Sequence, residues 1–306
     1  MKKTSVQVTL LLFLVRHVPP FLRFCMICII GTCYYLGSFK ARKAIRQFQK
    51  QVIASGGNIK QVSTFKTILS FSFALVEKVQ GWSHEGKQIP VTFSDDDISL
   101  LTQSISNGKG AVLVGNHLGN MDLMRCIALY GGMTQEKPLT VTAIRDLGAT
   151  TSFDNSVNAL DSNMLLYAID AGNITPATIE LLQERIDSGG IVVVTGDRIP
   201  SSQSERTVCI PFLGKDTQFP IGAYAIASML GADVYFMTAV RKQTLMVNAE
   251  YNMYVSKCPV NMTCKRSERN AMWALCAREY ASFLEKYAKL YPFQWYNFFN
   301  FWRNEK

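Results

Sequence analysis

Two short runs of apolar, mostly β-branched residues constrain the fold of this chain more than any other feature. The runs are Gly110 to Gly115 (GAVLVG) and Ile191 to Thr195 (IVVVT), and glycines stand beside both. A short run that is apolar throughout is typical of a strand buried on both faces, because a half-exposed strand alternates apolar and polar residues. Such strands need helices on both sides, so the runs predict a layered α/β fold.

Strand and helix signals alternate through the rest of the body. The helix predicted from Thr175 to Ser188 has a threonine cap, a proline in the first turn and two glycines after its end. No linker or internal repeat divides the chain, so we expect a single α/β domain with a mostly buried mixed sheet flanked by helices. The other predicted strands are 139–144, 164–169 and 234–240, and the other predicted helices are a region ending near Val79, 120–130, 221–230 and 267–290.

Positive charge is concentrated at the N-terminus. Residues 1–76 contain eleven Lys or Arg and no acidic residue, while the whole chain has a net charge of +9, so the remaining 230 residues carry 9 minus 11, or −2. A basic segment on an otherwise balanced chain suits anionic lipid headgroups, whereas a nucleic-acid-binding protein more often has a basic face on its folded body. We therefore expect a membrane partner and no nucleic acid, with a solvated basic arm as the alternative.

The first 50 residues are predicted to form the membrane-associating part. Residues 5–37 are strongly apolar but interrupted by charges and prolines, and the clean stretch from Phe24 to Leu36 is short for a spanning helix. We expect an uncleaved anchor followed by a basic helix, Lys40 to Lys50, against the headgroups. The alternatives are a signal peptide, which lacks a small-residue cleavage site here, and a helical hairpin buried in the fold. The predicted division is 1–50 for these helices and 51–306 for the α/β domain.

The eight cysteines predict neither a disulfide framework nor a metal site. Cys25 and Cys28 form a C-x-x-C, but they lie in an apolar run where thiols pack as small hydrophobic groups. No second pair has zinc-ligand spacing, and the chain has only three histidines. We expect reduced cysteines, no metal and no cofactor.

The segment that carries chemistry is VGNHLGNMD, residues 114–122. His117 follows a buried strand, and Asp122 comes five residues later at the start of a predicted helix. Imidazole accepts protons from hydroxyl groups near neutral pH, and a carboxylate can fix its tautomer. The spacing alone is common, and on its own it favours the alternative in which Asp122 merely caps a helix.

The context of this pair makes it specific. GNHLGNMDLMR resembles the first block of the lysophospholipid acyltransferase superfamily, in its lipid A biosynthesis (lauroyl/myristoyl) branch. Three later segments resemble further blocks of that branch in the same order, and the resemblance covers roughly residues 5–303. These segments are SGGIVVVTGDRIP, RTVCIPFLGKDTQFPIGAYAIASMLGADVYFM and YPFQWYNFFNFW.

The resemblance implies direct acyl transfer without a covalent acyl-enzyme. His117 would deprotonate a lipid hydroxyl, which attacks the thioester of acyl-carrier protein or acyl-CoA, and either Asp122 or Asp197 would orient His117. The residues implied in substrate binding or in stabilising the oxyanion are Asn116, Asn120, Arg145, Asp197 and Arg198. The resemblance also implies a location on the cytoplasmic face of a bacterial inner membrane, peripheral or held by one N-terminal anchor.

The chain departs from the common pattern of the branch. Asp122 stands where Glu is more usual, Asn116 replaces a small residue and Met121 replaces a tryptophan, which is closer to a divergent subgroup with other acylated products. Two other functions compete with transfer to a glycolipid or related lipid: a non-catalytic lipid-binding protein of the same fold, and a thioesterase-like hydrolase. A serine hydrolase is disfavoured because no G-x-S-x-G occurs.

Overall fold

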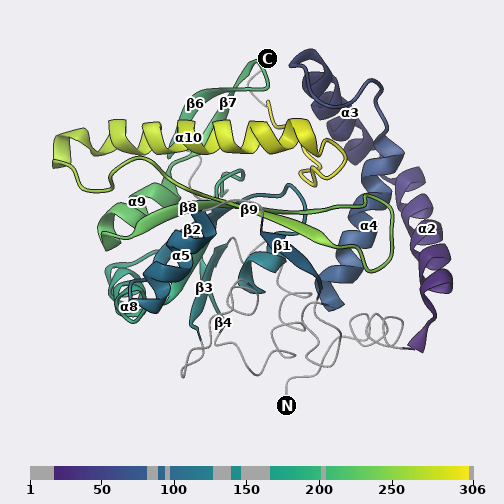
Figure 1. Ribbon diagram of the computed structural model, residues 1–306. Helices are drawn as coiled ribbons and strands as arrows, with labels where there is room; N and C mark the ends of the chain where they lie inside the picture. The colour runs from purple at the N-terminus through teal and green to yellow at the C-terminus, as the bar shows by residue number, and fades with distance from the viewer. Residues whose placement is uncertain are drawn as a thin grey trace.

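A seven-stranded mixed sheet forms the centre of the protein (Figure 1). The computed structural model describes residues 17–80, 89–93, 97–126, 139–145, 166–200 and 205–302. In the sheet the strands lie in the order β1-β9-β8-β2-β5-β3-β4. Their bounds are β1 Val91–Phe93, β2 Ala111–Gly115, β3 Val141–Arg145, β4 Leu166–Asp170, β5 Ile191–Thr195, β8 Asp233–Arg241 and β9 Tyr251–Lys257.

Five neighbouring strands run in the same direction. β2 pairs in parallel with both β5 and β8, and β3 pairs in parallel with both β5 and β4, while β8 and β9 are antiparallel. The carboxyl ends of β8, β2, β5, β3 and β4 therefore meet at one edge, where α/β folds place their sites. The predicted single α/β domain with a mixed sheet is confirmed.

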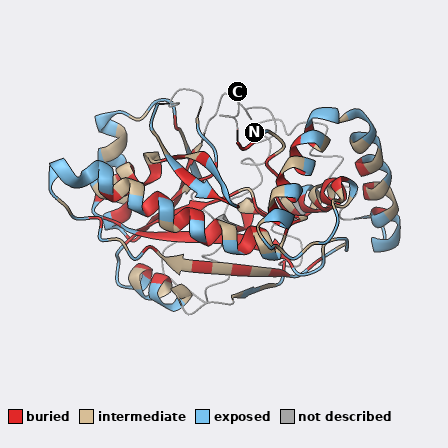
Figure 2. Ribbon diagram, turned by 90° about the horizontal axis from the view of Figure 1, so that it is seen from above, coloured by how far each residue is buried: buried red, intermediate tan, exposed pale blue. Residues whose placement is uncertain are grey.

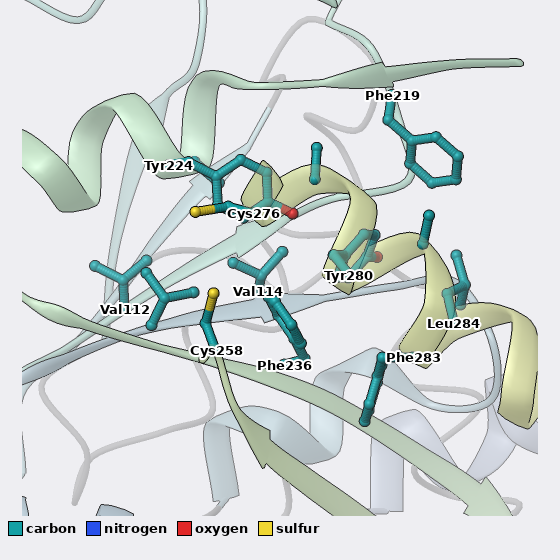
Figure 3. Packing of buried hydrophobic residues seen from close by; sticks show 14 of the residues in the cluster. Val112, Val114, Phe219, Tyr224, Phe236, Cys258, Cys276, Tyr280, Phe283 and Leu284 are labelled. Atoms are coloured by element: carbon teal, nitrogen blue, oxygen red, sulfur yellow. The ribbon is translucent and has the colours of Figure 1, made fainter. Parts of the chain in front are cut away.

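Helices cover both faces of this sheet. On one face Leu182, Ala227 and Tyr280 share a buried cluster with β2. They come from α8 (Pro176–Asp187), α9 (Gly222–Leu230) and α10 (Arg269–Leu290). On the other face Leu101, from α5 (Asp97–Ser106), packs in a second cluster with β2. Figure 3 shows the first of these clusters, with Val112 and Val114 of β2 near Tyr224 and Tyr280. Burial on both faces explains why β2 is apolar throughout.

Three helices near the N-terminus pack beside the sheet: α2 (Pro20–Gly37), α3 (Phe39–Ala54) and α4 (Thr64–Gln80) (Figure 1). The predicted boundary between residues 50 and 51 falls inside α3. Phe48 of that helix stacks on Trp295 with ring centroids 4.8 Å apart, and Val52 is fully buried in the main core. The basic helix is therefore joined to the body by its apolar face.

Helix α2 is one continuous helix that starts directly after Pro19. Its 18 residues are long and apolar enough to cross a membrane, with a mean hydropathy of 1.4, and 17% of them are buried. One side packs on α4. The ring centroids of Phe24 and Phe73 lie 5.4 Å apart, and a side chain at Gly31 would collide with Leu69. The outer side exposes Phe21, Leu22, Ile29, Ile30 and Leu36 (Figure 2).

Two segments differ from the sequence-based predictions. The predicted helix 120–130 begins as a 3₁₀ helix, η1 (Met121–Cys126), because the Leu123 N–H bonds the Asn120 carbonyl three residues back; residues 127–130 lie outside the described part of the chain. The strands β6 (Thr207–Phe212) and β7 (Lys215–Pro220) form an unpredicted hairpin. Its turn places Leu213 at a φ of 53°, and leucine gives no sequence signal for this conformation.

Candidate active site

His117 lies two residues beyond the end of β2, at the shared carboxyl edge of the parallel strands. Its side chain is 17% exposed, so part of the imidazole reaches the surface. The preceding strand is buried along its whole length and pairs on both sides. The imidazole is thus held by a buried strand and remains partly accessible to solvent.

The loop after His117 is shaped by Gly119. This residue has a φ of +77°, and a Cβ on it would lie 2.0 Å from the Ala239 carbonyl oxygen. Its N–H donates to the Gln294 carbonyl at 2.8 Å, and the next N–H, of Asn120, donates to Ala239 at 2.7 Å. Only glycine fits this close approach to β8, so the loop is fixed between β8 and the C-terminal tail.

The carboxylate that contacts Nδ1 of His117 belongs to Asp197. It lies two residues after β5, its side chain is completely buried, and its Oδ1 is 2.8 Å from Nδ1 of His117. Its Oδ2 accepts the backbone N–H of His117 at 2.7 Å and the side-chain N–H of Asn297 at 2.8 Å. The sequence offered two carboxylates for orienting His117, Asp122 and Asp197. Asp197 is the one whose side chain contacts the His117 ring.

The charge of this carboxyl follows from its neighbours. Burial alone would raise the pKa of Asp197, but the charge of His117, its two hydrogen bonds and the charge of Arg198 outweigh burial. The pKa of Asp197 consequently lies below its usual value, and the group is ionised at neutral pH. Because an ionised carboxylate only accepts hydrogen bonds, Nδ1 of His117 carries a proton, and Nε2 of the neutral ring is free to accept one.

Asp122, the carboxylate of the sequence motif, has a different partner. Its Oδ2 forms an ion pair of 2.9 Å with Nζ of Lys78, near the end of α4. Its backbone N–H is capped by Oδ1 of Asn120 at 3.2 Å. Asp122 thus fixes the start of η1 and ties it to α4.

The two asparagines of the motif are both buried. Asn116 donates to the Met237 carbonyl at 3.1 Å and accepts from Leu118 N–H and the Thr238 hydroxyl, so its amide joins the motif to β8. Asn120 is 4% exposed, and its Nδ2 has no hydrogen-bond partner among the described residues. A buried amide donor without a partner calls for an explanation, and a ligand of the site is one candidate.

The two predicted arginines lie at the same edge of the sheet. Arg145 ends β3, is half-buried and lies opposite Asp170 of β4. Arg198 follows Asp197 and is more exposed, and its Nε donates to Oδ1 of Asn297 at 2.8 Å. The sheet thus brings His117, Asp197 and Arg198 together and places Arg145 at the end of the strand next to β5.

Three residues at the site had no prediction from the sequence: Lys78, Gln294 and Asn297. Gln294 lies in the tail block QW, where its side chain forms two hydrogen bonds of 2.8 Å with the backbone of Arg241. Asn297 is 1% exposed and contacts both Asp197 and Arg198. The tail block carried the resemblance, but no pattern in it indicated a contact with a strand end 100 residues away.

A buried ion pair joins α4 to β8, the strand against which the loop after His117 is held. Glu77, the first acidic residue of the chain, lies 3.1 Å from the guanidinium of Arg241 at the end of β8, and both side chains are essentially unexposed. Tyr251 donates to the same carboxylate at 2.5 Å. Burial raises the pKa of Glu77, and Arg241 and Tyr251 offset part of this effect. Glu77 and Lys78 together fix α4 to β8 and to η1.

Comparison with known protein families gives a match over almost the whole chain. Residues 5–304 match the family model described as bacterial lipid A biosynthesis acyltransferase. A search of curated proteins gave no significant match. Within the described residues, no group of three or more His, Cys, Asp and Glu side chains could hold a metal ion.

Proposed function

Because the chain belongs to the bacterial lipid A biosynthesis acyltransferase family, we propose that it transfers a fatty acyl group from a thioester to a hydroxyl of a glycolipid or related membrane lipid, with His117 as general base. Family membership makes the protein an acyltransferase of lipid biosynthesis. The observation that carries the finer assignment is the 2.8 Å contact between Nδ1 of His117 and the buried Asp197. It leaves Nε2 as the nitrogen that takes the proton.

The proposed reaction is a direct transfer. Nε2 of His117 removes the proton of the acceptor hydroxyl as that oxygen attacks the thioester carbonyl carbon. The C–O bond forms, and the carbonyl oxygen becomes an oxyanion. When the oxyanion collapses, the C–S bond breaks, and the thiolate leaves with the proton held by His117. The ester and a thiol are the products, and Asp197 stabilises the transient imidazolium without being protonated itself.

The developing oxyanion needs a preorganised donor. Nδ2 of Asn120 is the first candidate, since Asn120 belongs to the motif and this buried nitrogen has no partner among the described residues. Arg198 and Arg145 remain candidates for this function or for binding an acceptor phosphate, because guanidinium groups bind phosphate in a bidentate way. Asn116, whose amide is used within the protein, would act by holding the loop in position.

The acceptor reaches the site from a membrane in this proposal. Residues 1–50 would associate with the cytoplasmic face of the inner membrane, with the exposed apolar side of α2 in contact with lipid and the basic residues of α3 against the headgroups. The acceptor would be a membrane lipid. The donor would be acyl-carrier protein or acyl-CoA, both of which present the same thioester.

The test is an acyl-transfer assay on membranes of expressing cells, with radiolabelled acyl-carrier protein or acyl-CoA and chromatographic separation of all lipids. Wild type should form a labelled lipid, and His117→Ala should lower its rate by about 10³-fold, because general base catalysis contributes 10²–10⁴-fold. His17→Ala, which removes an exposed histidine outside the site, is the matched control and should retain full activity.

Three results would count against the proposal. Labelled free fatty acid without a labelled lipid would identify a thioesterase-like hydrolase. Equal transfer by wild type and His117→Ala, at equal amounts of folded protein, would remove His117 from the reaction. An absence of turnover by wild type with either donor, despite lipid binding, would favour a non-catalytic lipid-binding protein.

A further inference from the structure

We infer that Asn297, from the C-terminal tail, is a positioning residue for the His117–Asp197 pair, which it holds together by bonding Asp197 and keeping Arg198 away from it. The inference rests on the proposed function of His117. Neither the sequence patterns nor the family match assigns this residue a part in the reaction. The argument follows from how the tail is attached, how the amide is oriented and what would replace it.

The tail is attached directly to the catalytic loop. Gly119 N–H bonds the Gln294 carbonyl, and Tyr296 N–H bonds the His117 carbonyl, both at 2.8 Å. Between these two bonds, Leu118 and Trp295 form an isolated antiparallel bridge. The backbone immediately before Asn297 is therefore fixed on His117 itself, and the side chain of Asn297 reaches the neighbouring strand end.

Chemistry fixes the orientation of the Asn297 amide. Nε of Arg198 is only a donor, so the atom 2.8 Å from it must be the amide oxygen. The Asp197 carboxylate only accepts, so the atom 2.8 Å from its Oδ2 must be the amide nitrogen. Asn297 is 1% exposed, and both ends of its amide are used.

This amide separates a cation from a carboxylate that are adjacent in the sequence. Oδ2 of Asp197 already accepts from the backbone of His117, and the Asn297 amide takes a second place on the same oxygen. Without that amide, the Arg198 guanidinium could bond Asp197 directly, because arginine forms strong bidentate pairs with carboxylates. Such a pair would turn Oδ1 away from Nδ1 of His117 and leave the imidazole in the wrong orientation for proton transfer.

The experiment compares kcat and KM of purified full-length enzymes, normalised to folded protein, for wild type and the variants named below, with Asn300→Ala as the matched control. Asn300 is an exposed asparagine of the same tail whose side chain bonds the Trp302 N–H. Asn297→Ala should lower kcat by about 30-fold and leave KM within about twofold, since small misplacements of catalytic groups cost up to about 10²-fold. Asn300→Ala should keep kcat within about twofold of wild type.

A second comparison tests whether Asn297 acts by keeping Arg198 away from Asp197. Replacing the competing guanidinium should weaken the effect, so Asn297→Ala should lower kcat by less than about threefold when it is made in an Arg198→Met background. A purely structural asparagine would cost the same in both backgrounds. Asn297→Asp, which matches the side chain in shape but removes its donor to Asp197, should lower kcat at least as much as Asn297→Ala.

Defined results would overturn the inference. They are an unchanged kcat in Asn297→Ala, a raised KM with an unchanged kcat, or an equal loss in both Arg198 backgrounds. His117→Ala measured in parallel separates this outcome from a failure of the proposed function. If His117→Ala is inactive while Asn297→Ala is normal, only the positioning by Asn297 is wrong.

Discussion

The two carboxylates of the candidate site, Asp197 and Asp122, differ in their burial and in their partners. Asp197, after β5, has a completely buried side chain whose bonds go to His117 and Asn297. Asp122, at the start of η1, has a side chain that is 9% exposed and pairs with Lys78, which is 22% exposed. One carboxylate is enclosed by the core and the tail, and the other faces a helix that also supports the apolar α2.

This difference shows that closeness in the sequence does not decide which carboxylate serves a histidine. Asp122 is five residues from His117, and Asp197 is eighty residues away. The parallel pairing of β2 and β5 sets Gly115 opposite Thr195, so His117 and Asp197 leave the sheet at the same level. Strand register therefore brings together what the sequence separates.

The largest expected effect comes from Asp197→Asn. Asparagine has nearly the same shape as aspartate but carries no charge. An amide in this place would no longer fix Nδ1 of His117 as a donor as a carboxylate does, and it would not stabilise the imidazolium. We expect kcat to fall by about 10³-fold with a small change in KM, measured by the acyl-transfer assay on purified enzyme. A loss smaller than that of the corresponding Asp122 variant would reverse the comparison.

A smaller effect is expected from Asp122→Asn. The change removes the ion pair with Lys78 but retains a side chain that can bond the start of η1, so kcat/KM should fall by about tenfold. Lys78→Gln should cost about as much, and the double variant should cost little more than either single variant, because both changes break the same contact. Independent, additive losses would show that Asp122 acts on the reaction through some other group.

Much of the fold could be predicted from the sequence. β2, β5, α8 and α9 carry strong local signals: apolar β-branched runs, a capped helix start and terminal glycines. The β6–β7 hairpin had a weaker signal, because only the second of its two turn residues at positive φ, Gly214, is of the expected type, while the first is Leu213. That turn is held from outside, by Gln51 of α3 on the Leu213 carbonyl and Glu285 of α10 on its N–H.

The residues of the candidate site also differ in whether the sequence around them carries a local signal. The placement of His117, Asp197 and Arg198 at one edge of the sheet could be predicted, because each follows a recognisable strand and the two strands are parallel neighbours. Lys78 and Asn297 could not, because a helix surface and an irregular tail show no periodicity that records a distant contact. The 3₁₀ geometry of η1 could not be predicted either, because the bond from the Leu123 N–H to the Asn120 carbonyl leaves no signal in the residue pattern.

The most direct test of the account is nuclear magnetic resonance of the His117 ring nitrogens in enzyme labelled with ¹⁵N-histidine, with Asp197→Asn and Asp122→Asn beside wild type. The chain has only three histidines, so His117→Ala assigns the signal. The account predicts a proton on Nδ1 in the neutral ring, with a resonance that moves strongly in Asp197→Asn and little in Asp122→Asn. A proton on Nε2 in wild type, or a resonance that responds to Asp122→Asn and not to Asp197→Asn, would contradict it.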